Sequence, residues 1–182
     1  MSEVQAKCVE SYRRLKNLKL VANEVGIPWQ TVYVHLRAAG EPVTGDKLRY
    51  GSDTDRFAAK AERVFQDLVP LAESQNEKKF QSKVDFMVGR YSVDVKASRY
   101  RHDRWAFSLK KQERIADFFV CFAFDEADGY RVIVIPGEVC RKFQTISLSG
   151  RSHTKWWDYE VEPSALAGFF AAVQHADENA AA

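Results

Sequence analysis

The chain has 182 residues, is 46% hydrophobic and carries a formal net charge of +2, which suits one domain of ordinary size or one with a small appendage. Its three cysteines, Cys8, Cys121 and Cys140, are far apart, and none of its four histidines has zinc-ligand spacing, so neither a disulfide framework nor a zinc site is expected. The sequence contains no signal peptide and no apolar run long enough to span a membrane, which indicates a cytoplasmic protein without a membrane partner.

The N-terminal part of the chain has the periodicity of short helices. Residues 4–15 predict a helix whose apolar side carries Val4, Cys8, Tyr12 and Leu15. In residues 18–36, Ala22 is small where two helices would approach, Gly26 permits a sharp turn, and Pro28 suits the first position of a helix. This segment resembles the helix-turn-helix of site-specific recombinases and small repressors.

The helix-turn-helix resemblance implies that residues 28–37 form a recognition helix in the major groove of DNA. Gln30 suits the edge of an adenine, and Arg37 suits a guanine or a phosphate. The side chains expected to contact DNA from this helix are Trp29, Gln30, Thr31, Tyr33 and Arg37. The alternative is a helical hairpin used for packing or dimerisation, in which Trp29 and Val34 would face a partner protein.

A linker and another helix follow. Gly40 fits a helix C-cap and Pro42 cannot continue a helix, so we expect a domain boundary and a linker over residues 42–51. The next helix is expected to begin near Ser52 and to end before Pro70. Its buried stripe is Phe57, Ala61, Val64, Phe65 and Leu68, with Glu62 at the edge. Residues 71–82 are expected to form a short strand or a loop.

Residues 83–96 have the alternation of a β-hairpin. Gly89 and Arg90 form a two-residue loop, and glycine at its first position suits a type II′ turn. This loop fixes the register, so that Val88 faces Tyr91 and each earlier residue faces a later one in turn. One face is then a core face with Val84, Phe86, Val88, Tyr91, Val93 and Val95. The other face carries Lys83, Asp85, Met87, Ser92, Asp94 and Lys96.

The polar face of this hairpin predicts a metal site. The register places Asp85 directly opposite Asp94, and like charges so placed destabilise a sheet. A divalent cation between the two carboxylates removes the repulsion, and Mg²⁺, for which Mn²⁺ can substitute, prefers such oxygen ligands. Lys96 lies two residues beyond Asp94, where its ammonium can orient a water molecule or neutralise charge on a phosphate.

Two carboxylates and a lysine in the arrangement Asp-x8-Asp-x-Lys resemble the PD-(D/E)xK nuclease superfamily. The proline that usually precedes the first aspartate is Val84 here, a position that is often apolar in the superfamily. The resemblance implies that an acidic residue on the preceding helix, which is Glu62 in this sequence, completes the metal site. The alternatives are an exposed hairpin with a charged outer face and a solvent-facing Glu62.

Basic and aromatic residues alternate in the segment 97–105, where Arg99, Arg101 and Arg104 are candidates for phosphate contacts; the alternative is a solvated loop. Ser108 suits the N-cap of a helix from Leu109 to about Ala116. A helix with lysine and glutamine at this place is similar to that of related nucleases and Holliday-junction resolvases. The resemblance implies phosphate-binding or water-positioning roles for Lys111 and Gln112.

The remaining segments predict strands closed by a helix. Residues 117–124 form a continuous apolar run typical of a central strand, and residues 130–135 and 145–149 suit further strands, with a short helix around Val139 and Phe143 between them. Over about residues 52–150 this order resembles the small intron-encoded homing endonucleases of the superfamily. The basic-aromatic segment 150–157 could contact DNA or cap the core with its tryptophans.

The fold class expected is α/β. It consists of a mixed-sheet, restriction-endonuclease-like PD-(D/E)xK core flanked by helices, with a small all-α helix-turn-helix domain at the N-terminus. The expected boundaries are 1–41 for the helix-turn-helix domain, 42–51 for the linker, 52–176 for the nuclease domain and 177–182 for a flexible tail.

The sequence therefore predicts a site-specific, Mg²⁺-dependent endonuclease that acts on double-stranded DNA as a homodimer or a higher symmetric oligomer. Its role could be homing, restriction or phage DNA processing. The alternatives are a non-catalytic DNA-binding regulator on a nuclease scaffold and a nuclease that resolves Holliday junctions.

Overall fold

The structure, a computed structural model, describes residues 2–43, 52–75, 84–109 and 116–180. The chain forms two compact units, and the division falls within helix α5 (Asp53–Leu68), between Arg56 and Phe57. The expected helix over residues 109–116, with Lys111 and Gln112, lies largely outside the described residues.

The described residues 2–43 of the first unit form the helices α1 (Glu3–Leu15), α2 (Leu18–Val25) and α3 (Trp29–Ala38). Their predicted positions are confirmed, and Gly26 ends α2 with a φ of +76°, the left-handed conformation that the sharp turn requires. The small core of this unit consists of Cys8, Val9, Tyr12, Val21, Val32 and Leu36.

Specific side chains define the helix ends and pairings in this unit. Asn17 caps α2 by accepting hydrogen bonds from the N–H groups of Lys19 and Leu20. Glu24 accepts hydrogen bonds from Arg14 on α1 and from the Ser11 hydroxyl at 2.7 Å, and these bonds lower the pKa of the Glu24 carboxyl. The pairing therefore ties α2 to α1.

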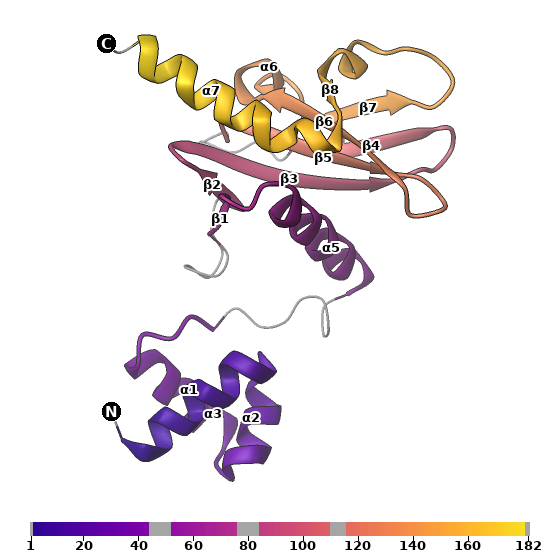
Figure 1. Cartoon of the computed structure of the whole chain (residues 1–182). Coiled ribbons are helices and arrows are strands. Elements are labelled where there is room, and N and C mark those ends of the chain that lie inside the picture. Colours follow the sequence, from indigo (N-terminus) through magenta and orange to yellow (C-terminus); the bar gives the residue numbers. More distant parts are fainter. Residues whose placement is uncertain (1, 44–51, 76–83, 110–115, 181–182) are drawn as a thin grey trace. The chain divides into compact units, whose positions relative to one another are not determined.

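A mixed six-stranded sheet is the centre of the second unit (Figure 1). Its strand order is β1-β2-β3-β5-β6-β8, with β3 and β5 parallel and every other neighbouring pair antiparallel. The strands are β1 (Glu73–Ser74), β2 (Phe86–Val88), β3 (Tyr91–Arg99), β5 (Phe118–Phe124), β6 (Tyr130–Pro136) and β8 (Glu160–Val161).

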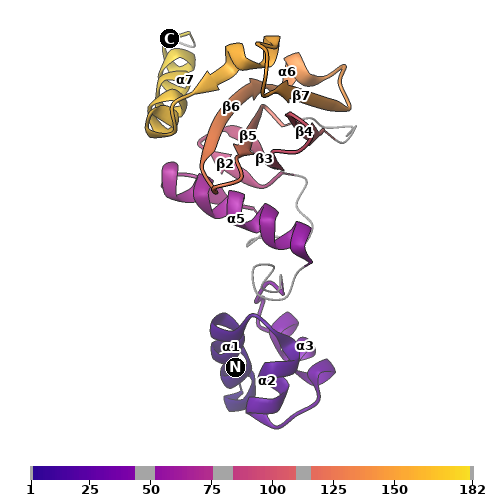
Figure 2. The same cartoon turned by 90° about the vertical axis from the view of Figure 1, so that its right-hand side faces the viewer.

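One face of the sheet is covered by helices α5 and α7 (Leu166–Ala180), as Figures 1 and 2 show. Phe65 of α5 lies at the centre of this layer, with its ring 4.9 Å from that of Phe86 and 6.0 Å from that of Phe170 on α7. Helix α7 extends to Ala180, so it includes residues 177–180, which were expected to belong to a flexible tail.

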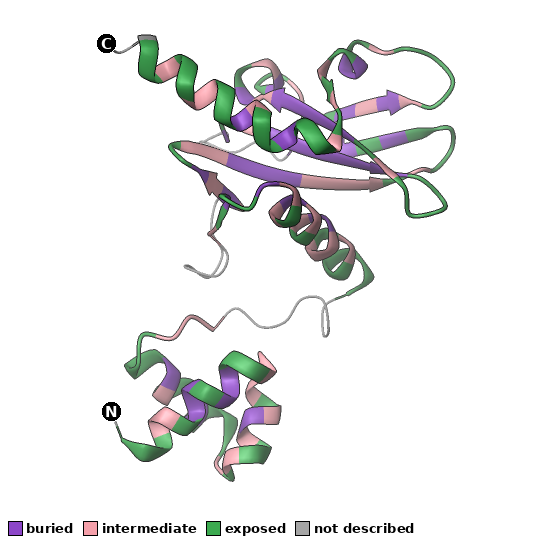
Figure 3. Ribbon diagram, viewed as in Figure 1, coloured by how far each residue is buried: buried purple, intermediate pink, exposed green. Residues whose placement is uncertain are grey.

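A second, two-stranded sheet covers the opposite face. It consists of β4 (Arg104–Ser108) and β7 (Thr145–Ser149), and it packs with α6 (Gly137–Cys140) and the 3₁₀ turn η1 (Lys155–Tyr159) on the main sheet. Trp105 fixes the contact by donating its indole N–H to the carbonyl of Phe124 at 2.7 Å. Figure 3 shows the resulting buried strands of the main sheet between exposed outer surfaces.

Strand β4 bears on one interpretation of the sequence. The structure places residues 104–108 in a strand, so the solvated loop that was the alternative for residues 97–105 does not hold over 104–105, and Ser108 is the last residue of this strand. The burial of β4 alternates strictly, with Trp105 and Phe107 inside and Arg104, Ala106 and Ser108 outside. This period of two was present in the sequence, but the basic residues around it obscured the pattern.

The mixed sheet flanked by helices confirms the α/β class. No helix within the described ranges has both the length and the apolar character needed to cross a membrane.

Candidate active site

The β2–β3 hairpin has the predicted register, with Phe86 opposite Val93, Met87 opposite Ser92 and Val88 opposite Tyr91. Gly89 has a φ of +59° and Arg90 does not have a positive φ, which fits the type II′ turn. Helix α7 holds the turn of the hairpin, because Asp177 contacts the side chains of Arg90 and Tyr91. The predicted core face is buried at Phe86, Val88, Val93 and Val95 and half-buried at Val84 and Tyr91.

Asp117, which the sequence analysis did not single out, fastens the start of β3 to β5. Its carboxylate accepts hydrogen bonds from the backbone N–H and the hydroxyl of Ser92, each at 2.7 Å, and its own N–H donates to the Ser92 hydroxyl at 3.0 Å. In the sequence, the signal for this role was the position of Asp117 directly before the apolar run that forms β5. These bonds set the beginning of the parallel pairing that continues through Asp94 opposite Phe119 and Lys96 opposite Cys121.

Asp85 precedes β2 and turns toward β3. Its N–H donates to the carbonyl of Val93 at 3.1 Å, and its carboxylate accepts the N–H of Val95 at 2.8 Å. This second bond crosses the hairpin and places the Asp85 carboxylate beside that of Asp94, close enough for the interaction between them to raise the pKa of Asp94. The two carboxylates are therefore brought together as the register predicted.

Asp94 is a buried acid, only 8% exposed, and it forms an ion pair with Lys96 in which the ammonium nitrogen lies 2.7 Å from a carboxylate oxygen. Burial against the apolar sheet, followed by the hydrogen bond with Asp85, raises the pKa of Asp94 to about 7, although the Lys96 charge acts in the opposite direction. The Asp94 carboxyl is therefore partly protonated near neutral pH, because the Lys96 charge does not fully offset the cost of burying a carboxylate beside Asp85.

The donor set fits a hard divalent cation. Two carboxylates lie side by side, and Mg²⁺ is commonly held by one or two protein carboxylates with water and substrate phosphate as the other ligands. Within the described ranges no group of three or more His, Cys, Asp or Glu residues is arranged to hold a metal. Glu62, the third ligand that the resemblance implied, is half-buried on α5 and does not complete such a group.

The side chains expected to contact DNA are at the surface wherever the structure describes them. On α3, Trp29 and Tyr33 are 44% and 41% exposed, and Gln30, Thr31 and Arg37 are exposed as well. In the second unit, Arg99, Arg101 and Arg104 are exposed around the connection between β3 and β4. Arg99 lies over the ring of Phe57 at 4.2 Å, so part of its side chain packs on α5.

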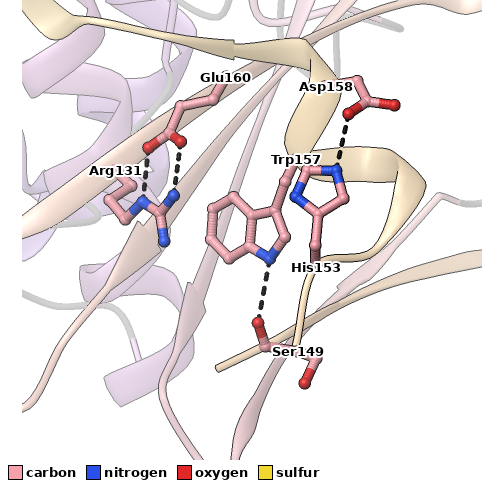
Figure 4. Close-up of polar contacts among 6 residues, drawn as sticks. All are labelled: Arg131, Ser149, His153, Trp157, Asp158 and Glu160. Carbon is pink, nitrogen blue, oxygen red and sulfur yellow. Dashed lines mark hydrogen bonds and ion pairs between the residues drawn. The ribbon is translucent and has the colours of Figure 1, made fainter. Parts of the chain in front are cut away.

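The basic-aromatic segment 150–157 has a structural role at its tryptophans. Trp156 and Trp157 are both buried, and Trp157 donates its indole N–H to the carbonyl of Ser149 at 3.0 Å (Figure 4). The guanidinium of Arg131 lies 3.6 Å from the centre of the Trp157 ring and pairs with Glu160. The tryptophans therefore cap the core, as one of the two interpretations of this segment expected.

Comparison with known proteins finds a similarity of structure. No protein-family model matches the sequence, and no curated protein is significantly similar to it. Among solved structures, the chain is similar to a bacterial homing endonuclease, I-Ssp6803I, with a TM-score of 0.50 and 16% sequence identity. The similarity covers 69% of this chain and 98% of that chain. At this level of identity the likeness shows a shared fold.

Proposed function

We propose that the protein is a DNA endonuclease of the PD-(D/E)xK type that hydrolyses phosphodiester bonds with a divalent cation. The observation that carries the proposal is the contact of Asp85, Asp94 and Lys96 on one hairpin of a sheet whose fold is shared with a homing endonuclease. A carboxylate pair with an adjacent lysine is suited to holding a metal and an attacking water at a phosphate.

In this proposal Asp85 and Asp94 hold Mg²⁺, with Mn²⁺ as a substitute, and the bound ion would polarise a phosphoryl oxygen and lower the pKa of a bound water. The Val95 N–H fixes the orientation of Asp85, so the first ligand is positioned before substrate binds. The half-buried ammonium of Lys96 orients the water and stabilises negative charge that develops on the phosphate. Burial of Asp94 strengthens these electrostatic interactions because water is excluded.

The first unit supports recognition of a DNA sequence. Its α3 exposes an amide, a hydroxyl, a guanidinium and two aromatic rings on a helix that follows a tight turn at Gly26, and this resemblance to a recognition helix supports the proposal. We propose that α3 enters the major groove and that the protein acts as a symmetric homodimer or higher oligomer, because cutting both strands of a duplex usually requires two active sites.

The experiment that tests the function is incubation of the purified protein with a mixed pool of genomic and phage DNA, with Mg²⁺ or with chelator. We expect discrete fragments that form only with the metal, and sequencing of their ends would give the recognition site. A four-way junction serves as a parallel substrate, and preferential cutting of the junction would identify a resolvase. Binding without cutting across several metals and DNA sources would identify a regulator instead.

Arg37→Ala tests the role of α3. The exposed side chain has no ion-pair partner within the described residues, so its removal should leave the fold intact. We expect DNA affinity to fall about tenfold, a loss of about 1.4 kcal/mol, because one guanidinium contact to a base or phosphate is removed. Fluorescence anisotropy in chelator measures the affinity, and unchanged metal-dependent stabilisation of the variant shows that the metal site still forms. Wild-type affinity would exclude Arg37 from the interface.

A further inference from the structure

The connection between β3 and β4 is a rigid hairpin with a basic tip. Arg101 and Arg104 bridge each other through two backbone hydrogen bonds of 2.9 and 3.1 Å, so only His102 and Asp103 form the loop. Both have a positive φ, of +51° and +60°, which corresponds to the tight turn preferred between twisted strands. Residues other than glycine adopt this conformation at a cost, and surrounding contacts must maintain it.

Those contacts come from the segment that follows β7. The carbonyl of Asp103 accepts the N–H of Gly150 at 2.8 Å, and its carboxylate pairs with Arg151 at 2.6 Å. The Tyr100 hydroxyl also donates to this carboxylate at 3.3 Å. The hairpin tip is therefore fixed to the β4–β7 ribbon and presents its charged groups in a defined arrangement.

The outer surface of the β4–β7 ribbon is polar and contains no acidic residue. The inner side chains Trp105, Phe107, Ile146 and Leu148 are buried in the core, which leaves the alternate residues outside. The facing pairs on this outer surface are Arg104 with Ser149, Ala106 with Ser147, and Ser108 with Thr145. Short side chains let the backbone of the ribbon approach a partner closely.

Positive charge lies at both ends of this ribbon. Arg101 and Arg104 are exposed at the hairpin end, and no acidic side chain pairs with either of them in the part of the chain that the structure describes. Arg141 and Lys142 are exposed shortly before β7 begins, at the other end, where the Leu109 N–H donates to the carbonyl of Gln144 at 2.7 Å. Five residues of antiparallel strand span about 17 Å, which exceeds the width of the DNA major groove, about 12 Å.

The ribbon lies beside the candidate active site. The Ala106 N–H on β4 donates to the Ser98 hydroxyl on β3 at 3.0 Å, and Ser98 shares a face of β3 with Asp94 and Lys96 because it is two residues beyond Lys96. A polyanion bound along the ribbon would therefore pass close to the carboxylate pair within one unit of the protein.

We propose that the β4–β7 ribbon enters the major groove of duplex DNA, with its short outer side chains against the base edges and the arginines at its hairpin end against phosphates. Two-stranded ribbons fit this groove, and the charge at each end of the ribbon complements the two phosphate backbones that border it. This inference rests on the proposed nuclease function, and it adds a second DNA-reading element next to the active site. It assigns the base reading by that unit to the short outer side chains of Ala106, Ser108, Thr145 and Ser147, and phosphate contact to Arg104.

The test places a carboxylate in the middle of this surface in the full-length protein. Ala106→Glu should weaken binding to a fluorescent DNA duplex in chelator at least about tenfold, because a negative charge would face the phosphates and base edges. Ala171→Glu on the exposed side of α7 makes the same chemical change elsewhere and should stay within about twofold of wild type. Ala106→Ser should also bind like wild type, which shows that substitution at this position is tolerated.

A second pair of variants measures phosphate contact. Arg104→Ala should reduce the slope of log affinity against log salt by about 1, whereas Arg63→Ala, an exposed arginine on α5, should leave the slope unchanged. Ala106→Glu with wild-type affinity for the duplex would overturn the proposal. Equal losses for a duplex and for a single strand of the same length would overturn the groove assignment.

The outcomes separate this inference from the proposed function. If Ala106→Glu binds DNA normally while Asp94→Ala abolishes cutting, the ribbon proposal fails and the nuclease stands. If no metal supports cutting but Ala106→Glu still loses duplex affinity, the nuclease fails and the ribbon remains a DNA-binding surface.

Discussion

Lys96→Ala and Asp94→Ala should each reduce DNA cleavage by at least about a hundredfold while DNA binding in chelator stays within about twofold of wild type. Removing Lys96 eliminates the ammonium that lies 2.7 Å from Asp94, and removing Asp94 eliminates a proposed metal ligand. Losses of this size are typical when one group that stabilises the transition state is deleted. The measurement is the initial rate of cleavage on a substrate cut by the wild type, with affinity determined separately by anisotropy.

Lys60→Ala is the matched control for the lysine. Lys60 also forms an ion pair, with Asp128 at 2.9 Å, but it lies on α5 outside the carboxylate cluster. Its removal should leave the cleavage rate within about twofold of wild type. Lys60 lies outside the carboxylate cluster, and the loss of an exposed ion pair costs little stability. A Lys96→Ala enzyme that cuts at the wild-type rate would remove Lys96 from the mechanism, whereas loss of binding and cutting together would indicate a folding defect.

In chelator, the Asp94→Asn variant should be more stable than wild type at pH 8, by up to about 4 kcal/mol. The pKa of Asp94 is about 7 in the folded chain, above its ordinary value of 3.8, so between these two pH values the folded state holds a proton that the unfolded state has lost. Above that range the folded state must keep an ionised carboxylate buried, which costs stability. Wild-type stability from this group is therefore present at low pH and is lost as the pH rises through about 7. The amide cannot ionise and escapes this loss.

Urea unfolding of both proteins between about pH 4 and about pH 8 measures the effect. This range includes nearly all of the interval between the ordinary and the folded pKa of Asp94 and extends above it. The stability difference should be small at the acidic limit, grow through pH 5 to 7 and level off above that. Added Mg²⁺ should stabilise wild type and leave Asp94→Asn little changed, because the variant lacks the charge that holds the ion. Asp158→Asn, which alters an exposed pair with His153, should show no such curve. A difference that does not change with pH would contradict the raised pKa of the buried Asp94 carboxyl.

The hairpin could be predicted from sequence because its determinants are local. A two-residue loop at Gly89 and strict alternation fixed the register, and with it the meeting of Asp85 and Asp94. The burial of Asp94 could not be predicted, because it depends on Phe119 and Cys121 of a strand that pairs with β3 only after a crossover. The same holds for Asp117, whose bonds to Ser92 are tertiary contacts between two strands.

The β3–β4 region shows a different limit of sequence analysis. For the basic residues between 99 and 104 a solvated loop was one of the two interpretations, but the chain continues through a two-residue turn at His102 and Asp103. Neither residue is glycine, so the sequence carried no strong signal for this turn. The turn is stabilised by Gly150 and Arg151, about fifty residues later, and a single sequence does not display such contacts.

The contact between α7 and the β2–β3 hairpin has a consequence for how the protein folds. Tyr91 and Asp177 meet although they are 86 residues apart, and the strand that carries Asp94 is paired with one reached only through a long crossover. Contacts between residues distant in sequence form slowly, because the entropy of closing long loops must be overcome first. We therefore expect the hairpin to reach its final geometry late in folding, so that partly folded chains lack the proposed metal site and should show no metal-dependent cleavage.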